Sequence, residues 1–313
     1  SMFLPANYSE FGPLRLHEPL SKWTTLRIGG AAEMFFEPHK PEHLANLLTA
    51  LENDGVPWTL LGAGANTVAP DGGLLGAVIH TGNMRRVFRD GAGLRVWPGV
   101  TLPTLVRTAQ GVGLSGLEKL VGVPGHVGGA LAMNAGSSAW GIWDQVKEVV
   151  LWSPGAVNPQ DGLKFRSWSR AEIQPTYRNG NLAGRVVLEV LLDLEEKKPA
   201  SIKATQDEFL KLKNLTQPVK LTSAGCAFKN PPSDSAGRLI DAAGLKGHRV
   251  GGAVVSELHA NFIVNQGGAT AADLRQLLGE IEQAVFAHSG ILLARELIVL
   301  PEPLEPRTKA EPL

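Results

Sequence analysis

The sequence predicts an α+β protein with two domains. Its 313 residues suit two domains of ordinary size. Short apolar segments between glycine and proline residues alternate with segments of helical periodicity, which indicates mixed secondary structure. A charged run that ends in proline, residues 195–199 (EEKKP), marks the best boundary. We therefore expect an N-terminal domain over residues 1–196, a smaller C-terminal α/β domain over 197–301, and a disordered, proline-rich tail over 302–313.

The composition excludes several classes of protein. Apolar residues make up 43% of the chain, enough for a core, and 30 basic residues balance 30 acidic ones. Without a basic field we expect no nucleic-acid partner. The single cysteine excludes an internal disulfide and a Cys-rich zinc module. No apolar run approaches the ~20 residues of a membrane span.

The N-terminal residues carry no basic region followed by an apolar run, so we expect no signal peptide. Ser1 before Met2 is expected to be a remnant of expression. We expect a cytoplasmic protein that binds no membrane, and a monomer. A cytoplasmic location also suits a lone free thiol.

Strands and helices alternate in the N-terminal part. Strands are expected over residues 32–37, 58–61, 76–80, 94–97, 146–152 and 185–194. Pro41 opens a helix over 42–54 with an apolar face, and Thr101 caps a second helix that has Pro103 in its first turn. Residues 111–136 contain so many glycines that we expect no regular structure there.

The C-terminal part reads as a smaller α/β segment. Helices are expected over 205–213, 235–245 and 271–288, and strands over 260–265 and 292–300. Thr270 caps the clearest of these helices, with Asp273 as its capping-box partner. The apolar stripe of this helix consists of Leu274, Leu277, Leu278, Ile281 and Val285.

Two glycine-rich loops are the strongest functional signal. Residues 62–66 (GAGAN) follow a strand and begin like G-x-G-x-x-G, but Thr67 stands at the third glycine position. Pro70 prevents a long helix after the loop, so a Rossmann nucleotide site is excluded by context. The loop can still offer backbone N–H groups to an anion, although a plain turn remains open.

The second loop lies within residues 122–136 (GVPGHVGGALAMNAG). Its glycines allow the backbone to approach a flat or phosphorylated ligand, whereas the simpler interpretation is a pair of turns. Two such loops together favour a nucleotide. The chain contains no G-x-x-x-x-G-K-[ST] motif, which argues against a P-loop ATPase.

A set of short motifs runs in order from about residue 22 to residue 300. They are residues 25–30 (TLRIGG), 62–66 (GAGAN), 71–73 (DGG), 122–136, 177–178 (YR), 223–231 (SAGCAFKNP), 243–247 (AGLKG), 256–262 (SELHANF) and 295–296 (RE). In this order they resemble the UDP-N-acetylenolpyruvoylglucosamine reductase (MurB) family. The region around Tyr177 has no long insertion, like the family's shorter type that lacks an extra substrate-capping loop.

The resemblance implies non-covalent FAD in an N-terminal domain of the vanillyl-alcohol-oxidase (PCMH) type, with two parts of about 1–80 and 81–196. The C-terminal domain would bind the substrate. The implied reaction is the NADPH-dependent reduction of the enolpyruvyl ether of UDP-N-acetylglucosamine to UDP-N-acetylmuramate, in peptidoglycan synthesis. The implied cofactor-binding residues are Arg27, Gly29, Gly62, Ala63, Gly64, Ala65, Asn66, Thr67, Gly122, Val123, Pro124, Gly125, Gly128, Gly129, Ala130, Asn134, Ala135 and Gly136.

Such a reaction needs a proton donor and a group that stabilises an enolate, while the cofactor supplies the hydride. Cys226 matches the proton donor, since a thiol is mostly protonated at neutral pH. Its alternative role is that of a buried, inert cysteine. Arg178 matches the family's catalytic arginine, because a guanidinium can bind a carboxylate through two hydrogen bonds. The alternative is an ordinary surface arginine.

Glu296 is the third catalytic candidate. Alternation along the expected strand 292–300 places it on an otherwise apolar face with Leu292, Ala294 and Ile298. A neutral carboxylic acid there could donate a hydrogen bond to an enolate, whereas the alternative is a salt bridge to an arginine. The expected substrate or NADPH contacts are Tyr177, Lys229, Asn230 and Asn261.

Other functions remain open from the residues alone. The chain could be a different FAD-dependent oxidase or reductase of the same fold, or a non-catalytic nucleotide-binding module. A cysteine hydrolase is a minor alternative, in which His259 or His126 would pair with Cys226. His39 and His43 are four residues apart, but Pro41 between them and the lack of further ligands argue against a metal site.

Overall fold

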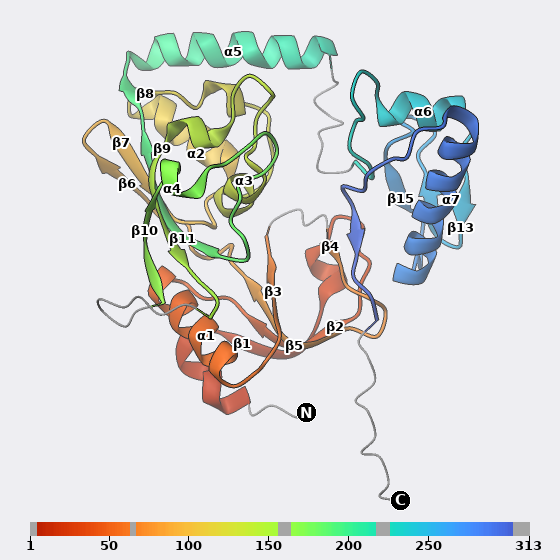
Figure 1. Ribbon diagram of the computed structural model, residues 1–313, viewed down its shortest axis with the longest axis horizontal. Coiled ribbons are helices and arrows are strands. Elements are labelled where there is room, and N and C mark those ends of the chain that lie inside the picture. The colour runs from red at the N-terminus through yellow and green to blue at the C-terminus, as the bar shows by residue number, and fades with distance from the viewer. Residues whose placement is uncertain (1–4, 63–66, 156–163, 217–225, 303–313) are drawn as a thin grey trace, which may run out of the picture. The chain divides into compact units, whose positions relative to one another are not determined.

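The computed structural model describes residues 5–62, 67–155, 164–216 and 226–302 (Figure 1). The chain forms two compact units that interleave along the sequence. The first unit comprises Ser1–Arg15, Phe35–Gly64 and Val78–Ala224, and the second comprises Leu16–Met34, Ala65–Ala77 and Gly225–Leu313. The domain boundary at residue 196 stays a prediction, and residues 303–313 of the expected tail over 302–313 lie outside the described residues.

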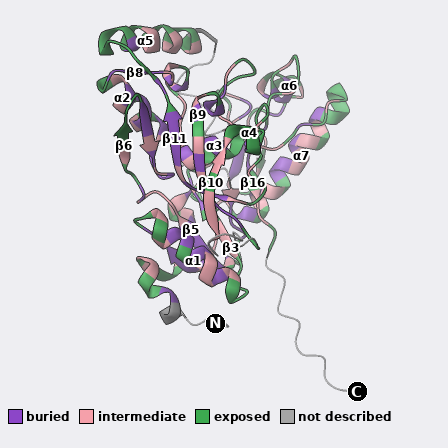
Figure 2. Cartoon of the chain, turned by 60° about the vertical axis from the view of Figure 1, so that its left-hand side comes forward, coloured by how far each residue is buried: buried purple, intermediate pink, exposed green. Residues whose placement is uncertain are grey.

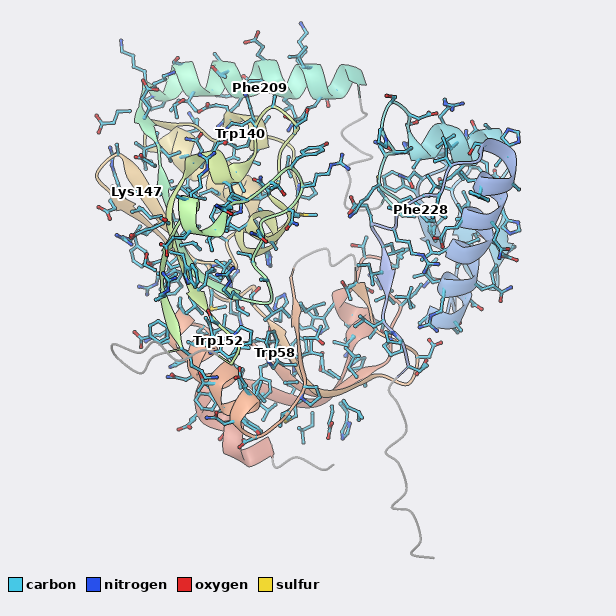
Figure 3. The ribbon with its side chains drawn as sticks, in the orientation of Figure 1. Trp58, Trp140, Lys147, Trp152, Phe209 and Phe228 are labelled. Atoms are coloured by element: carbon cyan, nitrogen blue, oxygen red, sulfur yellow. The ribbon has the colours of Figure 1, made fainter. Side chains whose placement is uncertain are left out.

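One four-stranded sheet has the order β1-β2-β5-β3. Its strands are β1 (Leu14–Pro19), β2 (Ala31–Phe36), β3 (Trp58–Leu61) and β5 (Leu74–His80). The boundaries between the units fall inside β1, β2 and β5. The helix α1 (Pro41–Asn53) begins with proline as predicted and buries Leu44, Leu47, Leu48 and Leu51. Near it, Trp152 contacts Trp58 edge to face, with ring centroids 5.9 Å apart (Figure 3).

The first unit contains a five-stranded antiparallel sheet of order β10-β9-β11-β7-β6. The strands are β6 (Val87–Asp90), β7 (Gly93–Val96), β9 (Val146–Trp152), β10 (Phe165–Ser169) and β11 (Val186–Asp193). The helices α2 (Leu102–Gly111) and α3 (Val127–Met133) bury Leu105 and Leu131 in one core with Val149 and Val190 of this sheet. As predicted, Thr101 caps α2, because its side chain accepts a hydrogen bond from the Thr104 N–H.

The expectation of no regular structure over residues 111–136 was wrong. This region contains β8 (Leu114–Ser115), η3 (Glu118–Leu120) and α3. Two glycines do not prevent α3, because tertiary packing supplies what helix propensity lacks. Val127, Ala130 and Leu131 of α3 are buried, and a Cβ on Gly128 would lie 3.1 Å from Pro98 Cβ. Close packing therefore uses one of the glycines that suggested a loop.

The helix α5 (Pro199–Thr216) is longer than the predicted 205–213. It packs against α2 and η3 in the first unit. The remaining elements of this unit are α4 (Arg170–Ile173), β12 (Glu195–Glu196), η1 (Pro5–Phe11) and η4 (Ile142–Gln145).

The second unit contains an antiparallel sheet of order β13-β14-β15 and two helices. The strands are β13 (Arg249–Val250), β14 (Ala253–Val255) and β15 (Ile263–Asn265), and the helices are α6 (Ala236–Ala242) and α7 (Ala271–Ser289). Thr270 and Asp273 form the predicted capping box of α7, whose buried face carries the predicted apolar stripe (Figure 2). Phe228 and Val255 belong to the same core. Also in this unit is η2 (Leu20–Trp23).

Residues 292–300 do not form the long strand that alternation predicted. Only β16 (Ile298–Val299) is regular, and it pairs in parallel with β4 (Thr67–Val68). The buried positions are Leu293 and Leu297, which are four residues apart, whereas Leu292 and Ile298 are 74% and 49% exposed. In the described parts of the chain, no helix is both long enough and apolar enough to cross a membrane.

Candidate active site

The first glycine loop begins at Gly62, directly after β3, whereas its residues Ala63, Gly64, Ala65 and Asn66 lie outside the described residues. A Cβ placed on Gly62 would lie 3.7 Å from His126 Nδ1. The start of the first loop therefore lies against the second glycine-rich stretch, as expected if both bind one ligand.

The second stretch uses glycine for its backbone conformation at three positions and leaves open space beside Gly125 and Gly129. Gly122, Gly125 and Gly136 have φ angles of +76°, +106° and +147°, which favour glycine. The stretch is anchored by backbone hydrogen bonds at 2.9 Å from Val127 N to Val100 O and from Leu102 N to Gly125 O. A Cβ on Gly129 would meet no atom within 4 Å, so packing within the protein does not require glycine there. This open, exposed backbone fits a flat or phosphorylated group.

Lys213 of α5 holds the residues just before this stretch. Its Nζ donates hydrogen bonds to Lys119 O at 2.8 Å and to Val121 O at 2.7 Å, immediately before Gly122. Burial lowers the pKa of Lys213. This role could not be predicted from the sequence, since a lysine on a polar helix is usually solvated.

A cluster of titratable groups includes His126 of this stretch. The rings of His126 and His80 have centroids 6.3 Å apart, and His80 Nδ1 lies 3.5 Å from Glu37 Oε1. Glu37 also pairs with Arg15 at 2.7 Å. Burial and the neighbouring His80 lower the pKa of His126 to about 4. The pKa of His80 is also lowered, because the effect of burial exceeds the opposite effect of the nearby Glu37 carboxylate.

We expect this cluster to weaken the fold in acid. Between pH 6.5, the ordinary histidine value, and about pH 4, His126 binds a proton in the unfolded state but not in the folded state. As the pH is lowered through this window, the free energy of unfolding should therefore decrease. His126 alone should contribute a decrease on the order of 3 kcal/mol. Thermal unfolding at several pH values measures this, and His126→Gln should flatten the dependence. His39→Gln is the control, because His39 is exposed, and it should leave the pH dependence of stability unchanged. If stability depends equally on pH in the wild type and both variants, His126 is not the group responsible.

Arg178 lies in a tight turn of the first unit. Thr176 and Asn179 close the turn with two backbone hydrogen bonds, at 2.8 and 3.0 Å. Arg178 has a φ of +57°, is exposed, and places its guanidinium 5.2 Å from the Tyr177 ring centroid. In the described part of the chain no ion pair to Arg178 is seen, and its catalytic role stays a prediction beside the alternative of an ordinary surface arginine. The turn presents a guanidinium that a substrate carboxylate could bind.

Asn134, a predicted cofactor residue, holds this turn instead. Its side chain donates to Thr176 O at 2.9 Å and accepts from the Trp143 N–H at 3.2 Å. Asn134 ends α3 in the left-handed conformation, with a φ of +47°. The amide thus links the glycine-rich stretch to the arginine turn, and any contact of Asn134 with a cofactor stays a prediction.

We expect Gly180→Ala to impair the site without unfolding the protein. The Gly180 N–H donates to Ala132 O at 2.9 Å, and a Cβ at Gly180 would overlap the Leu131 carbonyl oxygen. To relieve this clash, the turn must shift away from α3. We expect this shift to lower the free energy of unfolding by about 1–3 kcal/mol. We predict a 10- to 100-fold loss of kcat/KM, about the effect of a 1 Å misplacement. Gly111→Ala is the control, since its Cβ would meet no atom within 4 Å; wild-type kinetics in Gly180→Ala would contradict this account.

Cys226 lies in the second unit, on a segment held on both sides. It forms an isolated antiparallel bridge with Phe262, and Phe228 forms another with Arg295. Between them, the Ala227 N–H donates to Asn261 O, and Ala227 O accepts from the Glu296 N–H, both at 2.9 Å. The topology therefore fixes Cys226 and Glu296, two of the three predicted catalytic residues, next to each other.

The environment of Cys226 favours the protonated thiol. The side chain is partly buried, and burial together with the negative charge of Glu296 raises the pKa of Cys226. A reactive thiolate would need the opposite environment, with nearby positive charge. His259 does not supply it, because its Nδ1 accepts from the Asn261 N–H at 3.3 Å and its ring packs on Phe262. The site is therefore suited to proton donation and not to nucleophilic attack.

Glu296 is half-buried, but the expected apolar face around it is mostly exposed. Arg295 does not pair with it, because Arg295 Nε donates to Glu282 Oε1 on α7 at 2.9 Å. That ion pair anchors the segment to the helix. Two residues beyond Glu296, Ile298 pairs with Thr67, which directly follows the first glycine loop. Within the second unit, Thr67 and the segment that carries Glu296 are thus joined although they are far apart in sequence.

The other predicted contacts differ in their placement. Lys229 is exposed, with its backbone N–H bonded to Ala294 O at 2.8 Å. Asn230 accepts from the Ala236 N–H at the start of α6. Arg27, with a φ of +55°, and Gly29, with +133°, lie in a turn of the second unit. Asn261 is 3% exposed, and its amide is bonded within the protein.

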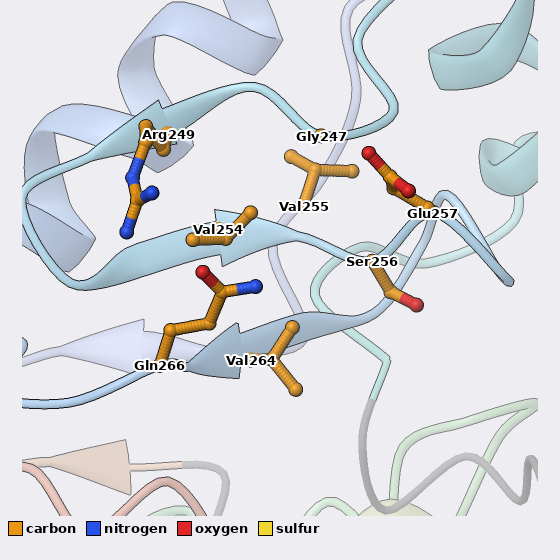
Figure 4. A pocket seen from close by; sticks show the side chains of 8 residues that line it. All are labelled: Gly247, Arg249, Val254, Val255, Ser256, Glu257, Val264 and Gln266. Atoms are coloured by element: carbon orange, nitrogen blue, oxygen red, sulfur yellow. The ribbon is translucent and has the colours of Figure 1, made fainter.

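A separate cavity of about 330 Å³ lies on the sheet of the second unit (Figure 4). Polar side chains line much of it, and none of the predicted catalytic residues does. The lining residues are Gly247, Arg249, Val254, Val255, Ser256, Glu257, Val264 and Gln266. Over the described ranges, no three His, Cys, Asp or Glu side chains are grouped so that they could hold a metal ion.

Comparisons with known proteins match both the N-terminal and the C-terminal parts of the chain. A family model described as an FAD binding domain matches residues 32–155, which include the second glycine-rich stretch. The chain is therefore a flavin-binding protein by class. A second model, the C-terminal domain of UDP-N-acetylenolpyruvoylglucosamine reductase, matches residues 217–300, which include Cys226 and Glu296.

Individual relatives cover nearly the whole chain. The UDP-N-acetylenolpyruvoylglucosamine reductase of Pelobacter propionicus is 39% identical over 93% of this chain and 97% of its own length. That of Moorella thermoacetica is 41% identical over 92% of this chain and 93% of its own length. The crystal structure of MurB from Thermus caldophilus, 37% identical, covers 92% of this chain and 98% of its own, with a TM-score of 0.73. The chain belongs to the UDP-N-acetylenolpyruvoylglucosamine reductase family.

Proposed function

We propose that this protein is an FAD-dependent oxidoreductase that reduces UDP-N-acetylglucosamine enolpyruvate to UDP-N-acetylmuramate with NADPH. The observation that carries the proposal is the arrangement of the second unit, in which Cys226 is held beside Glu296 and Thr67 continues the first glycine loop next to the same segment. Relatives of this name, at about 40% identity over nearly the full length, support the same activity.

The chain's own residues fit FAD. The open backbone around Gly125 and Gly129, with Gly62 beside it, leaves room for a planar or phosphorylated group. We assign the domain over residues 1–196 to the cofactor and residues 197–301 to the substrate. When bound, FAD supplies the transfer of hydride from NADPH to the alkene of the substrate.

Arg178 and Glu296 act on the negative charge that the reaction creates. Hydride addition to the terminal carbon of the enolpyruvyl group places that charge on the carboxylate side as an enolate. The guanidinium of Arg178 binds this carboxylate and stabilises the charge. Glu296 is the second residue that we assign to the enolate, because the hydrogen bond from its backbone N–H to Ala227 O holds it beside Cys226.

Cys226 completes the reaction by giving the thiol proton to the carbon next to the carboxylate. A C–H bond forms as the S–H bond breaks, and the resulting thiolate then regains a proton from water. The raised pKa of Cys226 keeps the thiol protonated before the reaction and favours this reprotonation. Tyr177, Lys229 and Asn230 remain proposed contacts of the UDP-sugar or of NADPH.

The proposed setting is the cytoplasm, where the protein acts as a monomer in the synthesis of peptidoglycan precursors. The test is a steady-state assay of FAD-loaded protein with NADPH. We expect NADPH oxidation that depends on the enolpyruvyl substrate and forms UDP-N-acetylmuramate. Oxygen consumption without any effect of this substrate would instead indicate an oxidase of the same fold that acts on another small molecule.

A further inference from the structure

Asn261 is buried in the second unit and touches the Cys226 segment through both ends of its amide. Asn261 Oδ1 accepts from the Phe228 N–H at 3.0 Å, and Asn261 Nδ2 donates to Phe228 O at 2.9 Å. Its backbone carbonyl accepts from the Ala227 N–H at 2.9 Å. One residue therefore supplies three hydrogen bonds to the two residues that follow Cys226.

This side chain replaces strand pairing that the backbone does not provide. Cys226 pairs with Phe262 only as an isolated bridge, and β15 begins one residue later, at Ile263. An amide side chain has the same donor and acceptor as a peptide group, so it can continue a ladder where strands diverge. Both ends of the amide are bonded to Phe228 in a buried setting, so the side chain serves the protein's own backbone.

The opposite side of the segment is held by the segment that carries Glu296. Lys229 N–H donates to Ala294 O at 2.8 Å, and Ala227 O accepts from the Glu296 N–H at 2.9 Å. With Asn261 on one side and Glu296 on the other, the segment has little freedom to move Cys226 relative to the carboxylate. Removal of the amide would free one side only.

We propose that Asn261 is a positioning residue, which sets the location of the Cys226 thiol beside Glu296 and so its readiness to give up a proton. The inference rests on the proposed function for its kinetic consequence, but the positioning itself can be measured without cofactor or substrate. Cys226 is the only cysteine in the chain, so alkylation reports on this thiol alone.

The experiment measures the rate of alkylation by iodoacetamide against pH in the wild type and in Asn261→Ala. Without the amide of Asn261, the Cys226 segment should move more freely. Water should then reach the thiol, and the thiol should lie farther from Glu296. We expect the midpoint of the alkylation profile to fall by about one pH unit in Asn261→Ala. At a pH below both midpoints, the variant would then hold about ten times more thiolate than the wild type and react about ten times faster. In the FAD-loaded enzyme, kcat should fall by about 10- to 100-fold, as for a misplaced reacting group, while the KM for NADPH stays within a factor of about three.

Asn265→Ala is the matched control. Asn265 lies on β15, donates to Leu26 O at 2.9 Å and accepts from the N–H groups of Gly267 and Ala269. It therefore loses comparable amide hydrogen bonds in the same unit, but none to the Cys226 segment. Its alkylation profile should match the wild type even if its melting temperature falls. If Asn261→Ala does not fold, Asn261→Leu removes both amide hydrogen bonds at nearly the same volume and without adding a charge, and should shift the profile in the same direction.

The proposal is overturned if both asparagine variants give the wild-type midpoint, or if Asn265→Ala shifts it as much as Asn261→Ala. A shifted midpoint in a protein that shows no enolpyruvyl-dependent turnover would uphold the positioning role and reject the proposed function. If the Asn261 variants have the wild-type midpoint and the wild-type enzyme shows enolpyruvyl-dependent turnover, the positioning role is rejected and the proposed function is upheld.

Discussion

Replacement of Cys226 by alanine is expected to leave the reduction of the bound flavin by NADPH nearly unchanged and to slow its reoxidation by substrate. The thiol has no part in the first half-reaction, but it supplies the proton that completes the second. Loss of a general acid costs about 10²- to 10⁴-fold in rate, and we expect an effect of this size. Anaerobic stopped-flow absorbance measures the two half-reactions separately.

Cys226→Ser is the matched variant, because a hydroxyl keeps a proton donor of similar size in the same place. It should retain substantial activity. An equal loss in both half-reactions of Cys226→Ala would indicate a structural role for the cysteine. Full activity in Cys226→Ala would place the proton donor elsewhere.

The second large effect concerns the open backbone at Gly129. We expect Gly129→Leu to fold at least as well as the wild type, since its Cβ meets no protein atom within 4 Å and leucine favours a helix over glycine by about 1 kcal/mol. FAD binding should nevertheless weaken by about 5- to 150-fold, because a side chain forced into a packed contact costs about 1–3 kcal/mol. Fluorescence titration with FAD and thermal unfolding measure the two quantities.

Gly111→Leu is the control for this experiment. Gly111 also lies in a helix of the first unit and has no atom within 4 Å of a Cβ position. Its FAD affinity should equal that of the wild type. If Gly129→Leu binds FAD as tightly as this control, the glycine-rich stretch does not form the cofactor site.

Much of the fold could be predicted from local sequence signals. Thr101 and Thr270 cap helices as expected, because a capping hydrogen bond joins residues only a few positions apart. The strands at 146–152 and 186–193 follow from continuous apolar runs. By contrast, α3 was missed, since its stability comes from packing against Pro98 and the sheet and not from its glycine-rich sequence.

The catalytic candidates came from motif resemblance, and the structure adds their local setting. Alternation suggested an apolar face around Glu296, but the chain there is irregular and its buried residues are four apart. The position of His126 against Gly62 and the hydrogen bonds of Lys213 gave no signal in sequence, because Gly62 and the carbonyls before Gly122 are distant in the chain from these two residues. Asn134 and Asn261 carry motif positions whose amides turn out to bind the protein's own backbone.

The central claim is that this chain uses bound FAD to reduce an enolpyruvyl sugar nucleotide. An anaerobic absorbance titration of the FAD-loaded protein tests it most directly. The account predicts that NADPH bleaches the visible flavin band and that UDP-N-acetylglucosamine enolpyruvate, added without oxygen, restores it with formation of UDP-N-acetylmuramate. A protein that retains no flavin, or a bleached flavin that recovers only when oxygen is admitted, would contradict it.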